Sequence, residues 1–297
     1  MRVFVTGATG FVGSAVVKEL IAAGHQVTGL ARSAAAAQAL AAAGAQAHQG
    51  DLEDFGSLRQ AAAESDGVIH TGFNHDFSKF QLSCEMDRHI IETMGAALEG
   101  SQRPLIVTSG IGVLPHGVLS TERTMPAGGA AAHPRAATEQ AVDALLERGV
   151  HAAVVRLPPS VHGAGDHAFV PMLIGMARQT GVSAMIEGGL NRWPAVHRLD
   201  AARLFRLVLE QGAAGSRYHG VAEEGVTFRD IAGAIGDGLG LPVADRSAAE
   251  ADAHFGWFSH FVAMDVPASS AWTREVLGWR PAQPGLLADL SAANYFA

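Results

Sequence analysis

The sequence predicts an α/β protein with a doubly wound parallel sheet and a smaller, discontinuous C-terminal domain. Three observations lead to this fold class. Short apolar segments alternate with helical segments through the first 157 residues, at a spacing typical of parallel β-α-β units. A glycine-rich turn lies between the first strand and the first helix. The alternation ends after Leu157, where proline, glycine, histidine and aromatic residues become frequent.

Apolar runs bounded by turn residues place six strands in the first part of the chain. We expect these strands at residues 2–6, 26–31, 45–48, 67–71, 104–108 and 152–157. Apolar residues at helical spacing predict helices at 14–23, between Ser33 and Gly44, at 58–63, 84–98 and 136–148. Beyond Leu157 we expect strands at 195–199 and 218–221, a helix at 201–210 capped by Asp200, and a helix at 228–239 opened by Thr227.

The order of these elements predicts two interleaved domains. Residues 1–157 form the domain of the parallel sheet, and residues 194–222 return to it. Residues 158–193 and 223–297 form the smaller domain.

The composition excludes several classes of protein. Of the 297 residues, 48% are hydrophobic and 17% charged, which suits a packed core rather than a disordered chain. The formal net charge is −8 and no run of lysines and arginines occurs, so we expect no nucleic-acid partner. No apolar run reaches the roughly 20 residues of a membrane helix. With no leader-like segment and one cysteine, Cys84, we expect a cytoplasmic protein without disulfides.

The glycine-rich turn predicts a dinucleotide-binding site of the Rossmann type. Residues 6–13 read TGATGFVG, directly between a strand and a helix. Gly7 permits a tight turn, Gly10 lets the backbone approach a phosphate, and Gly13 lets the helix pack closely on the strand. The free N–H groups at the start of the helix then face the pyrophosphate.

The end of the second strand predicts a preference for NADP(H). An acidic residue there would bind a ribose 2′-hydroxyl and repel a 2′-phosphate, but the sequence is Ala31-Arg32-Ser33. The planar guanidinium of Arg32 can pair with the 2′-phosphate, although a solvated loop arginine is the alternative. Asp51 and Leu52 follow the third strand and are placed to contact adenine, unless Asp51 is an ordinary turn residue.

Several motifs together resemble the extended and atypical short-chain dehydrogenase/reductases. They are TGATGFVG at 6–13, GDL at 50–52, a serine at the end of the fifth strand, RLPPSVHG at 156–163, AVHRLDAAR at 195–203 and LGW at 277–279. The resemblance implies a nicotinamide cofactor and a C-terminal substrate domain. The expected cofactor-binding residues are Gly7, Thr9, Gly10, Phe11, Val12, Gly13, Arg32, Ser33, Asp51, Leu52, Thr71, Gly72, Arg135, Pro158 and Val161.

The family's catalytic set of Asn, Ser, Tyr and Lys is only partly matched. Ser109 falls at the position of the serine and is expected to polarise a substrate carbonyl. The Tyr-x-x-x-Lys pair is missing, since neither of the two tyrosines is followed by a lysine four residues on. Ala131 takes the place of the tyrosine. Arg135 takes the place of the lysine and is expected to bind the nicotinamide ribose.

Two residues are candidates for the proton donor that the missing tyrosine would supply. His133 lies beside the vacated position, and imidazole is the usual proton carrier near neutral pH. Asp87 aligns with the family's asparagine on an otherwise apolar helix face. Desolvation would raise the pKa of such a carboxyl and make it an acid, whereas a structural aspartate is the alternative.

These features predict an NADPH-dependent reductase that acts on a carbonyl or imine group of an apolar or aromatic small molecule. The rival interpretations are a sugar-nucleotide epimerase or dehydratase, and a sensor that binds NADP(H) without catalysis. No histidine pair has metal-ligand spacing, so we expect no metal. The aromatic cluster at 254–261 is expected to line a substrate pocket, to form a homodimer surface or to fill the core.

Overall fold

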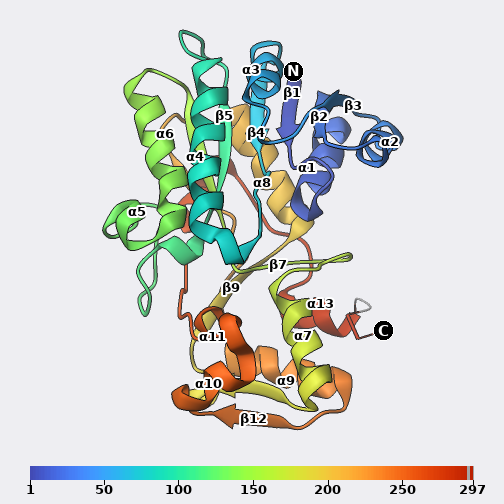
Figure 1. Cartoon of the computed structure of the whole chain (residues 1–297), viewed down its shortest axis with the longest axis vertical. Coiled ribbons are helices and arrows are strands. Elements are labelled where there is room, and N and C mark those ends of the chain that lie inside the picture. Colours follow the sequence, from blue (N-terminus) through green and yellow to red (C-terminus); the bar gives the residue numbers. More distant parts are fainter. Residues whose placement is uncertain (293–294, 297) are drawn as a thin grey trace.

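A seven-stranded parallel sheet forms the upper part of the molecule in Figure 1, a computed structural model that describes residues 1–292, 295 and 296. The strand order is β10-β6-β5-β4-β1-β2-β3, and every neighbouring pair is parallel. The chain runs outward in both directions from β1 and β4, which places a binding crevice at their carboxyl ends. The strands are β1 (Arg2–Thr6), β2 (Gln26–Ala31), β3 (Gln46–Gln49), β4 (Gly67–His70), β5 (Leu105–Gly110), β6 (Ala152–Leu157) and β10 (Arg217–His219).

Helices cover both faces of this sheet and enclose two apolar cores. The first core lies under α1 (Phe11–Ala22), α2 (Ala34–Ala42) and α8 (Arg198–Gln211). The second lies under α3 (Phe55–Ala63), α4 (Phe80–Ala96) and α6 (Ala137–Glu147). This arrangement confirms the doubly wound fold expected from the alternation of strands and helices.

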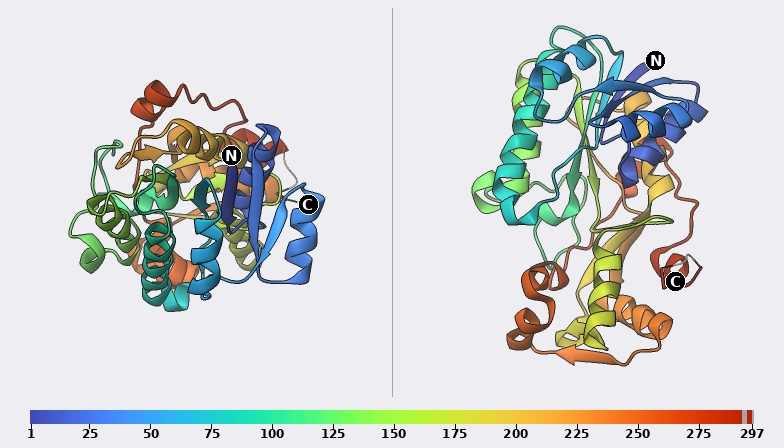
Figure 2. Two further views of the ribbon diagram at one scale, coloured as in Figure 1. Left: turned by 90° about the horizontal axis from the view of Figure 1, so that it is seen from above. Right: turned by 45° about the vertical axis from the view of Figure 1, so that its right-hand side comes forward.

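The smaller part lies below the parallel sheet, and Figure 2 shows the two parts one above the other. It contains a three-stranded sheet of β11 (Glu223–Thr227), β9 (Arg192–His197) and β7 (Ser160–His162), and a parallel pair of β12 (Val243–Arg246) and β8 (Ser183–Ile186). Its helices are α7 (Phe169–Thr180), α9 (Phe228–Leu239), α10 (Ala248–Phe255), α11 (Ser259–Val262) and α13 (Leu286–Ala292).

Short elements complete the chain at the ends of the main strands. Two helices belong here, α5 (Gly129–Ala132) and α12 (Ala271–Leu277). The 3-10 turns are η1 (Phe77–Lys79), η2 (Ile111–Val113), η3 (Pro134–Ala136), η4 (Glu187–Gly189) and η5 (Gly256–Phe258). The segments that contain η1 and η3 hold Phe77 and Arg135 of the candidate site.

The residues that return to the large sheet are not quite those that the sequence predicts. The helix α8 and the strand β10 join the large part, but β9 pairs in the smaller sheet. Trp272, Leu277 and Trp279 pack against the first core, although they follow residue 223. His197 rather than Asp200 caps α8, since its Nδ1 accepts a hydrogen bond from the backbone N–H of Leu199.

None of the helices in the described residues has the length and apolar character that a bilayer-spanning segment requires.

A glycine controls how closely α4 and α6 approach on one face of the sheet. A Cβ atom added to Gly95 of α4 would overlap the δ-carbons of Leu145, which is buried in α6. Gly175 of α7 provides the contrast, because no atom lies within 4 Å of the Cβ that it could carry.

We therefore predict opposite effects of the same substitution at these two helical glycines. Gly95→Ala should lower the free energy of unfolding by about 1–3 kcal/mol through overpacking. Gly175→Ala should raise it by about 0.5–1 kcal/mol, because alanine restricts the unfolded chain and favours the helix. Urea unfolding of both variants measures the difference. Equal effects would contradict the α4–α6 packing described here.

Candidate active site

The glycine-rich turn has the geometry that a bound dinucleotide requires. Gly7 has a positive φ of 63°, and a Cβ there would lie 2.7 Å from the backbone nitrogen of Gly72. A Cβ on Gly13 would overlap the carbonyl oxygen of Gly7 and lie 2.8 Å from Thr71 Oγ1, so the helix approaches the turns after β1 and β4 rather than the strand itself. Thr9 and Gly10 are exposed, and α1 begins without a side-chain cap or an acidic first turn. Its free N–H groups suit a phosphate.

The residues expected around the adenosine lie at the carboxyl ends of β2 and β3. Arg32 is exposed, and no hydrogen bond or ion pair joins its side chain to another described residue. Ser33 caps α2, since its Oγ accepts from the N–H of Ala36 at 3.2 Å. Asp51 Oδ1 accepts from two backbone N–H groups, those of Glu53 and Asp54, and therefore also shapes its turn.

Five other expected cofactor residues follow β3, β4 and β6 or lie in β7. Thr71 and Gly72 follow β4 and are tied to Thr6, whose carbonyl accepts from Thr71 Oγ1 and whose hydroxyl accepts from the N–H of Gly72. Leu52 Cδ2 lies 3.2 Å from the position that a Cβ on Gly72 would occupy, so the Leu52 side chain packs against the backbone of Gly72. Pro158 is buried after β6, and Val161 is half-buried in β7.

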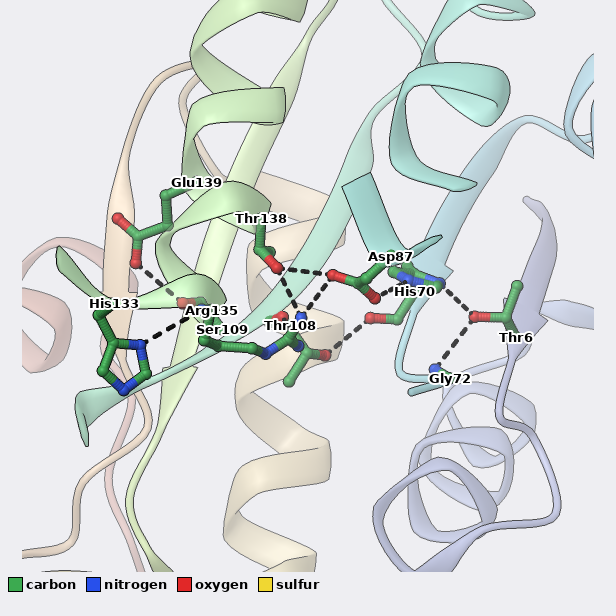
Figure 3. A network of polar contacts seen from close by, with 10 residues as sticks. All are labelled: Thr6, His70, Gly72, Asp87, Thr108, Ser109, His133, Arg135, Thr138 and Glu139. Atoms are coloured by element: carbon green, nitrogen blue, oxygen red, sulfur yellow. Dashed lines mark hydrogen bonds and ion pairs between the residues drawn. The ribbon is translucent and has the colours of Figure 1, made fainter. Parts of the chain in front are cut away.

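A buried chain of polar side chains connects this turn to the segment after α5. The hydroxyl of Thr6 lies 2.6 Å from His70 Nδ1, and His70 Nε2 lies 2.9 Å from Asp87 Oδ1 (Figure 3). Asp87 Oδ2 accepts from Thr138 Oγ1 at 2.6 Å and from Arg135 Nη1. The chain therefore crosses the carboxyl ends of β1 and β4 and ends on the first residues of α6.

The expectation that Asp87 has a raised pKa and acts as an acid is wrong. Burial alone would raise its pKa, but the charge of Arg135 and the hydrogen bonds from His70 and Thr138 outweigh burial and lower the pKa to about 2. Asp87 is thus an ionised structural carboxylate. Its partners are the side chains of His70, Arg135 and Thr138 on other elements.

Arg135, which we expect to bind the nicotinamide ribose, makes three hydrogen bonds and keeps spare donors. Its Nη1 donates to Asp87 and Thr138, and its Nη2 donates to the carbonyl oxygen of Thr108 at 3.0 Å. The ring of Phe73 stacks on the guanidinium at 4.0 Å. A guanidinium has five N–H donors, so two remain for a ligand.

Ser109, which we expect to polarise a substrate carbonyl, has a buried partner in this structure. Ser109 is 3% exposed, and its hydroxyl donates to Glu139 Oε1 at 2.9 Å. Glu139 also pairs with Arg156 and Arg217, and these charges keep its pKa low although burial would raise it. The Ser109 hydroxyl has one proton, and it donates that proton to the buried carboxylate of Glu139. Ser109 is therefore part of the core beside the sheet.

His133, a candidate proton donor, keeps one ring nitrogen without a partner among the described residues. Its Nδ1 accepts from the backbone N–H of Arg135 at 3.3 Å, which leaves Nε2 for a proton (Figure 3). Burial lowers the pKa of His133, and the positive charges of His116, His260 and Arg135 lower it further. Phe80 meets the imidazole edge to face at 6.1 Å.

An aromatic cluster joins the two parts of the molecule beside His133. Phe77 lies at its centre, stacked on Phe80 at 5.8 Å and on Trp257 at 5.2 Å. Phe261 meets Phe77 edge to face at 5.4 Å, and Phe169 and Phe258 continue the cluster into the smaller part. The cluster contains residues of the 254–261 segment that were expected to line a pocket or fill the core, and it places them near the candidate proton donor.

Several residues of the site were not foreseen from the sequence. His70 and Arg156 lie within otherwise apolar strands, and a polar residue in a buried strand indicates a buried partner. Glu139, at the start of α6, gave no comparable indication. In the described residues no group of three or more His, Cys, Asp or Glu side chains is arranged to hold a metal ion.

Comparison with known proteins extends these observations. A protein of Schizosaccharomyces pombe is 50% identical over 298 residues, covering 100% of both chains, and one of Saccharomyces cerevisiae is 48% identical over 99% of both; both are uncharacterized. A relative from Stigmatella aurantiaca, 4-hydroxy-2-methyl-3-oxo-4-farnesyl-3,4-dihydroquinoline-1-oxide ketoreductase, is 30% identical over 73% of this chain and 67% of its own.

Solved structures share the fold. The dTDP-glucose 4,6-dehydratase of Streptomyces venezuelae, solved with NAD bound, superposes with a TM-score of 0.80 at 21% identity, over 100% of this chain and 96% of the other. The model of the NAD dependent epimerase/dehydratase family matches residues 3–221, which include the glycine-rich turn, the Asp87 network and α8. The chain therefore belongs to the NAD dependent epimerase/dehydratase family.

Proposed function

We propose that this chain is an NADPH-dependent reductase of a carbonyl or imine group in an apolar or aromatic small molecule. The observation that carries the proposal is the pairing of a glycine-rich cofactor turn with His133, whose Nε2 is free and whose ring adjoins an aromatic cluster. The ketoreductase relative, although distant, supports reduction of a ketone within this family.

The residues present fit a nicotinamide dinucleotide. The missing Cβ atoms of Gly7 and Gly13 give the close approach of backbone that a pyrophosphate needs. Arg32 would hold the 2′-phosphate, Leu52 would face the adenine, and the two spare donors of Arg135 would bind the nicotinamide ribose. When bound, the cofactor would supply the hydride.

His133 takes over the proton that the family's tyrosine supplies elsewhere. In the neutral ring the backbone N–H of Arg135 binds Nδ1 and so orients Nε2 away from that segment. The proton delivered to the substrate oxygen or nitrogen is the Nε2 proton of the imidazolium, which forms when His133 is protonated. Asp87 holds the Arg135 side chain and so the segment on which His133 lies. Asp87 acts as a positioning residue, because its own low pKa prevents it from donating a proton near neutral pH.

The aromatic cluster sets the class of substrate. Phe77, Phe80, Phe261 and Trp257 place apolar ring faces beside His133, and Trp257 is 54% exposed, so part of this surface remains open. Flat or apolar groups gain free energy on such a surface by leaving water. A sugar nucleotide would instead require basic groups for its diphosphate.

The first prediction concerns the choice of cofactor. NADPH should bind at least about tenfold more tightly than NADH, because a charged bidentate pair contributes roughly 1.5–3 kcal/mol. Arg32→Ala should remove most of this difference and leave NADH affinity unchanged. Calorimetric titration of both cofactors measures it, with Arg59→Ala on α3 as a control for lost charge. Equal wild-type affinities would refute the preference.

The second prediction concerns the proton. The donor must be protonated, so the rate of carbonyl reduction should fall as the pH rises through the pKa of His133. Because that pKa is lowered, the fall should be centred below the ordinary value of about 6.5. His133→Ala should remove this pH dependence and lower kcat by about 10²–10⁴-fold.

A neighbouring variant makes this test sharper. His260→Ala removes a positive charge that lowers the pKa of His133, so it should shift the midpoint of the profile upward and keep kcat near the wild-type value. An unchanged profile in His133→Ala would show that another group supplies the proton. Tight NADPH binding without oxidation in the presence of any carbonyl or imine would favour a sensor.

The third prediction checks the revised role of Ser109. Ser109→Ala should leave kcat within about twofold of the wild type and lower the free energy of unfolding by about 0.5–1.5 kcal/mol, the contribution of one buried hydrogen bond. Steady-state kinetics and urea unfolding measure the two effects. A loss of about 10² in kcat would restore Ser109 to the reacting centre.

A further inference from the structure

Arg198 is a half-buried cation without a counter-ion. It opens α8, and no ion pair joins it to a carboxylate in the part of the chain that the structure describes. Its Nη1 donates to the carbonyl oxygen of Ala164 at 2.9 Å and its Nη2 to Ser14 Oγ at 3.1 Å, both neutral acceptors. Its Nε is buried and has no partner. A guanidinium withdrawn from water normally pairs with an anion.

Asp200 is the acidic residue nearest to Arg198 in sequence, and Asp166 lies in the adjoining loop. Both bind other groups. Asp200, two residues further along α8, accepts from the backbone N–H groups of Ala282 and Gln283. Asp166 accepts from the N–H of Ala168 and from the hydroxyl of Tyr295. Neither carboxylate neutralises Arg198.

The position of Arg198 connects it to the glycine-rich turn. Its guanidinium carbon lies 4.7 Å from the centroid of the Phe11 ring, and Phe11 is the first residue of α1. Ser14, which accepts from Arg198, lies one turn further along α1. The long contact between α1 and α8 fixes this arrangement. The unpaired charge therefore lies against the helix start that offers free N–H groups to a phosphate.

The loop before α7 holds Arg198 from its other side. A Cβ on Gly163 would lie 3.0 Å from Arg198 Cγ and 2.8 Å from His197 Nε2, so the loop backbone packs directly on these side chains. Tyr295 anchors this loop by its hydroxyl, which accepts from the N–H of Gly163 at 3.0 Å. His167 of the same loop meets the edge of Phe11 at 5.8 Å.

We infer that Arg198 is the counter-ion of the cofactor's diphosphate, supplied by α8 across the α1–α8 contact. The inference rests on the dinucleotide site of the proposed function and adds to it a binding residue from outside the glycine-rich motif. Arg198 then binds the diphosphate, which NADPH and NADH share. Arg32 binds the 2′-phosphate, which only NADPH carries. Phe11 and Ser14 hold the guanidinium ready before the ligand arrives.

Titrations of the full chain with NADPH, NADH and 2′-AMP test this assignment. Arg198→Gln should weaken NADPH and NADH alike, by about 10–100-fold, as expected for loss of a charge-assisted hydrogen bond. The affinity for 2′-AMP, which lacks the diphosphate, should not change. Arg198→Lys, which keeps the charge, should recover part of the loss. Arg203→Gln, an exposed charge change on the same helix, should bind all three ligands as the wild type does.

Three results would overturn the inference. Unchanged dinucleotide affinity in a folded Arg198→Gln variant would make Arg198 a structural link between the Ala164 loop and α1. A loss confined to NADPH would place it at the 2′-phosphate. An equal loss in Arg198→Lys and Arg198→Gln, with a lowered melting temperature in both, would show that the fit of the side chain and not its charge matters. The proposed function would be refuted separately if the chain did not prefer NADPH or did not reduce a carbonyl or imine. The predicted loss of affinity for both dinucleotides in Arg198→Gln depends on neither of these results.

Discussion

The ionised carboxylate of Asp87 is the constraint on which the candidate site depends. A buried charge of this kind is costly unless several donors surround it, and Asp87 has three, from His70, Thr138 and Arg135. These donors come from β4, from α6 and from the turn before α6. One carboxylate on α4 thus joins β4 to the start of α6, which lies more than 60 residues further along the chain, and through Thr6 it reaches the glycine-rich turn.

The same carboxylate explains how an arginine can stand where the family has a lysine. A guanidinium has more donors than an ammonium group and a planar shape, so it can satisfy Asp87, Thr138 and the carbonyl of Thr108 and still keep N–H groups for a ribose. The stacked ring of Phe73 restricts its orientation. A lysine has three donors and would leave fewer for a ligand. Under the proposed function, His133 would supply the proton and Arg135 would bind the ribose, in place of the family's catalytic pair.

The parts of this structure that follow from local sequence could be predicted, and those that follow from distant partners could not. The glycine-rich turn is a local feature, because the spacing of Gly7, Gly10 and Gly13 between a strand and a helix specifies the backbone. Whether Ser109 meets a ligand or a buried partner depends on what packs on its face of the strand. The partner, Glu139, is 30 residues away. The pKa of Asp87 depends on Arg135, which lies 48 residues further along the chain. The burial of Asp87 could therefore be predicted, but not the charge that offsets the effect of burial on its pKa. The uncompensated charge of Arg198 likewise emerges only when α1 and α8 are placed side by side.

Arg135, held in place by Asp87, is the proposed ribose-binding group on which the candidate site depends. A crystal structure of the chain with NADPH tests this most directly. We predict that the spare N–H groups of Arg135 lie within hydrogen-bond distance of the nicotinamide ribose hydroxyls while its Nη1 remains on Asp87, with the diphosphate on the glycine-rich turn. A bound NADPH whose nicotinamide ribose makes no contact with Arg135, or an Arg135 that leaves Asp87 to reach it, would contradict the account.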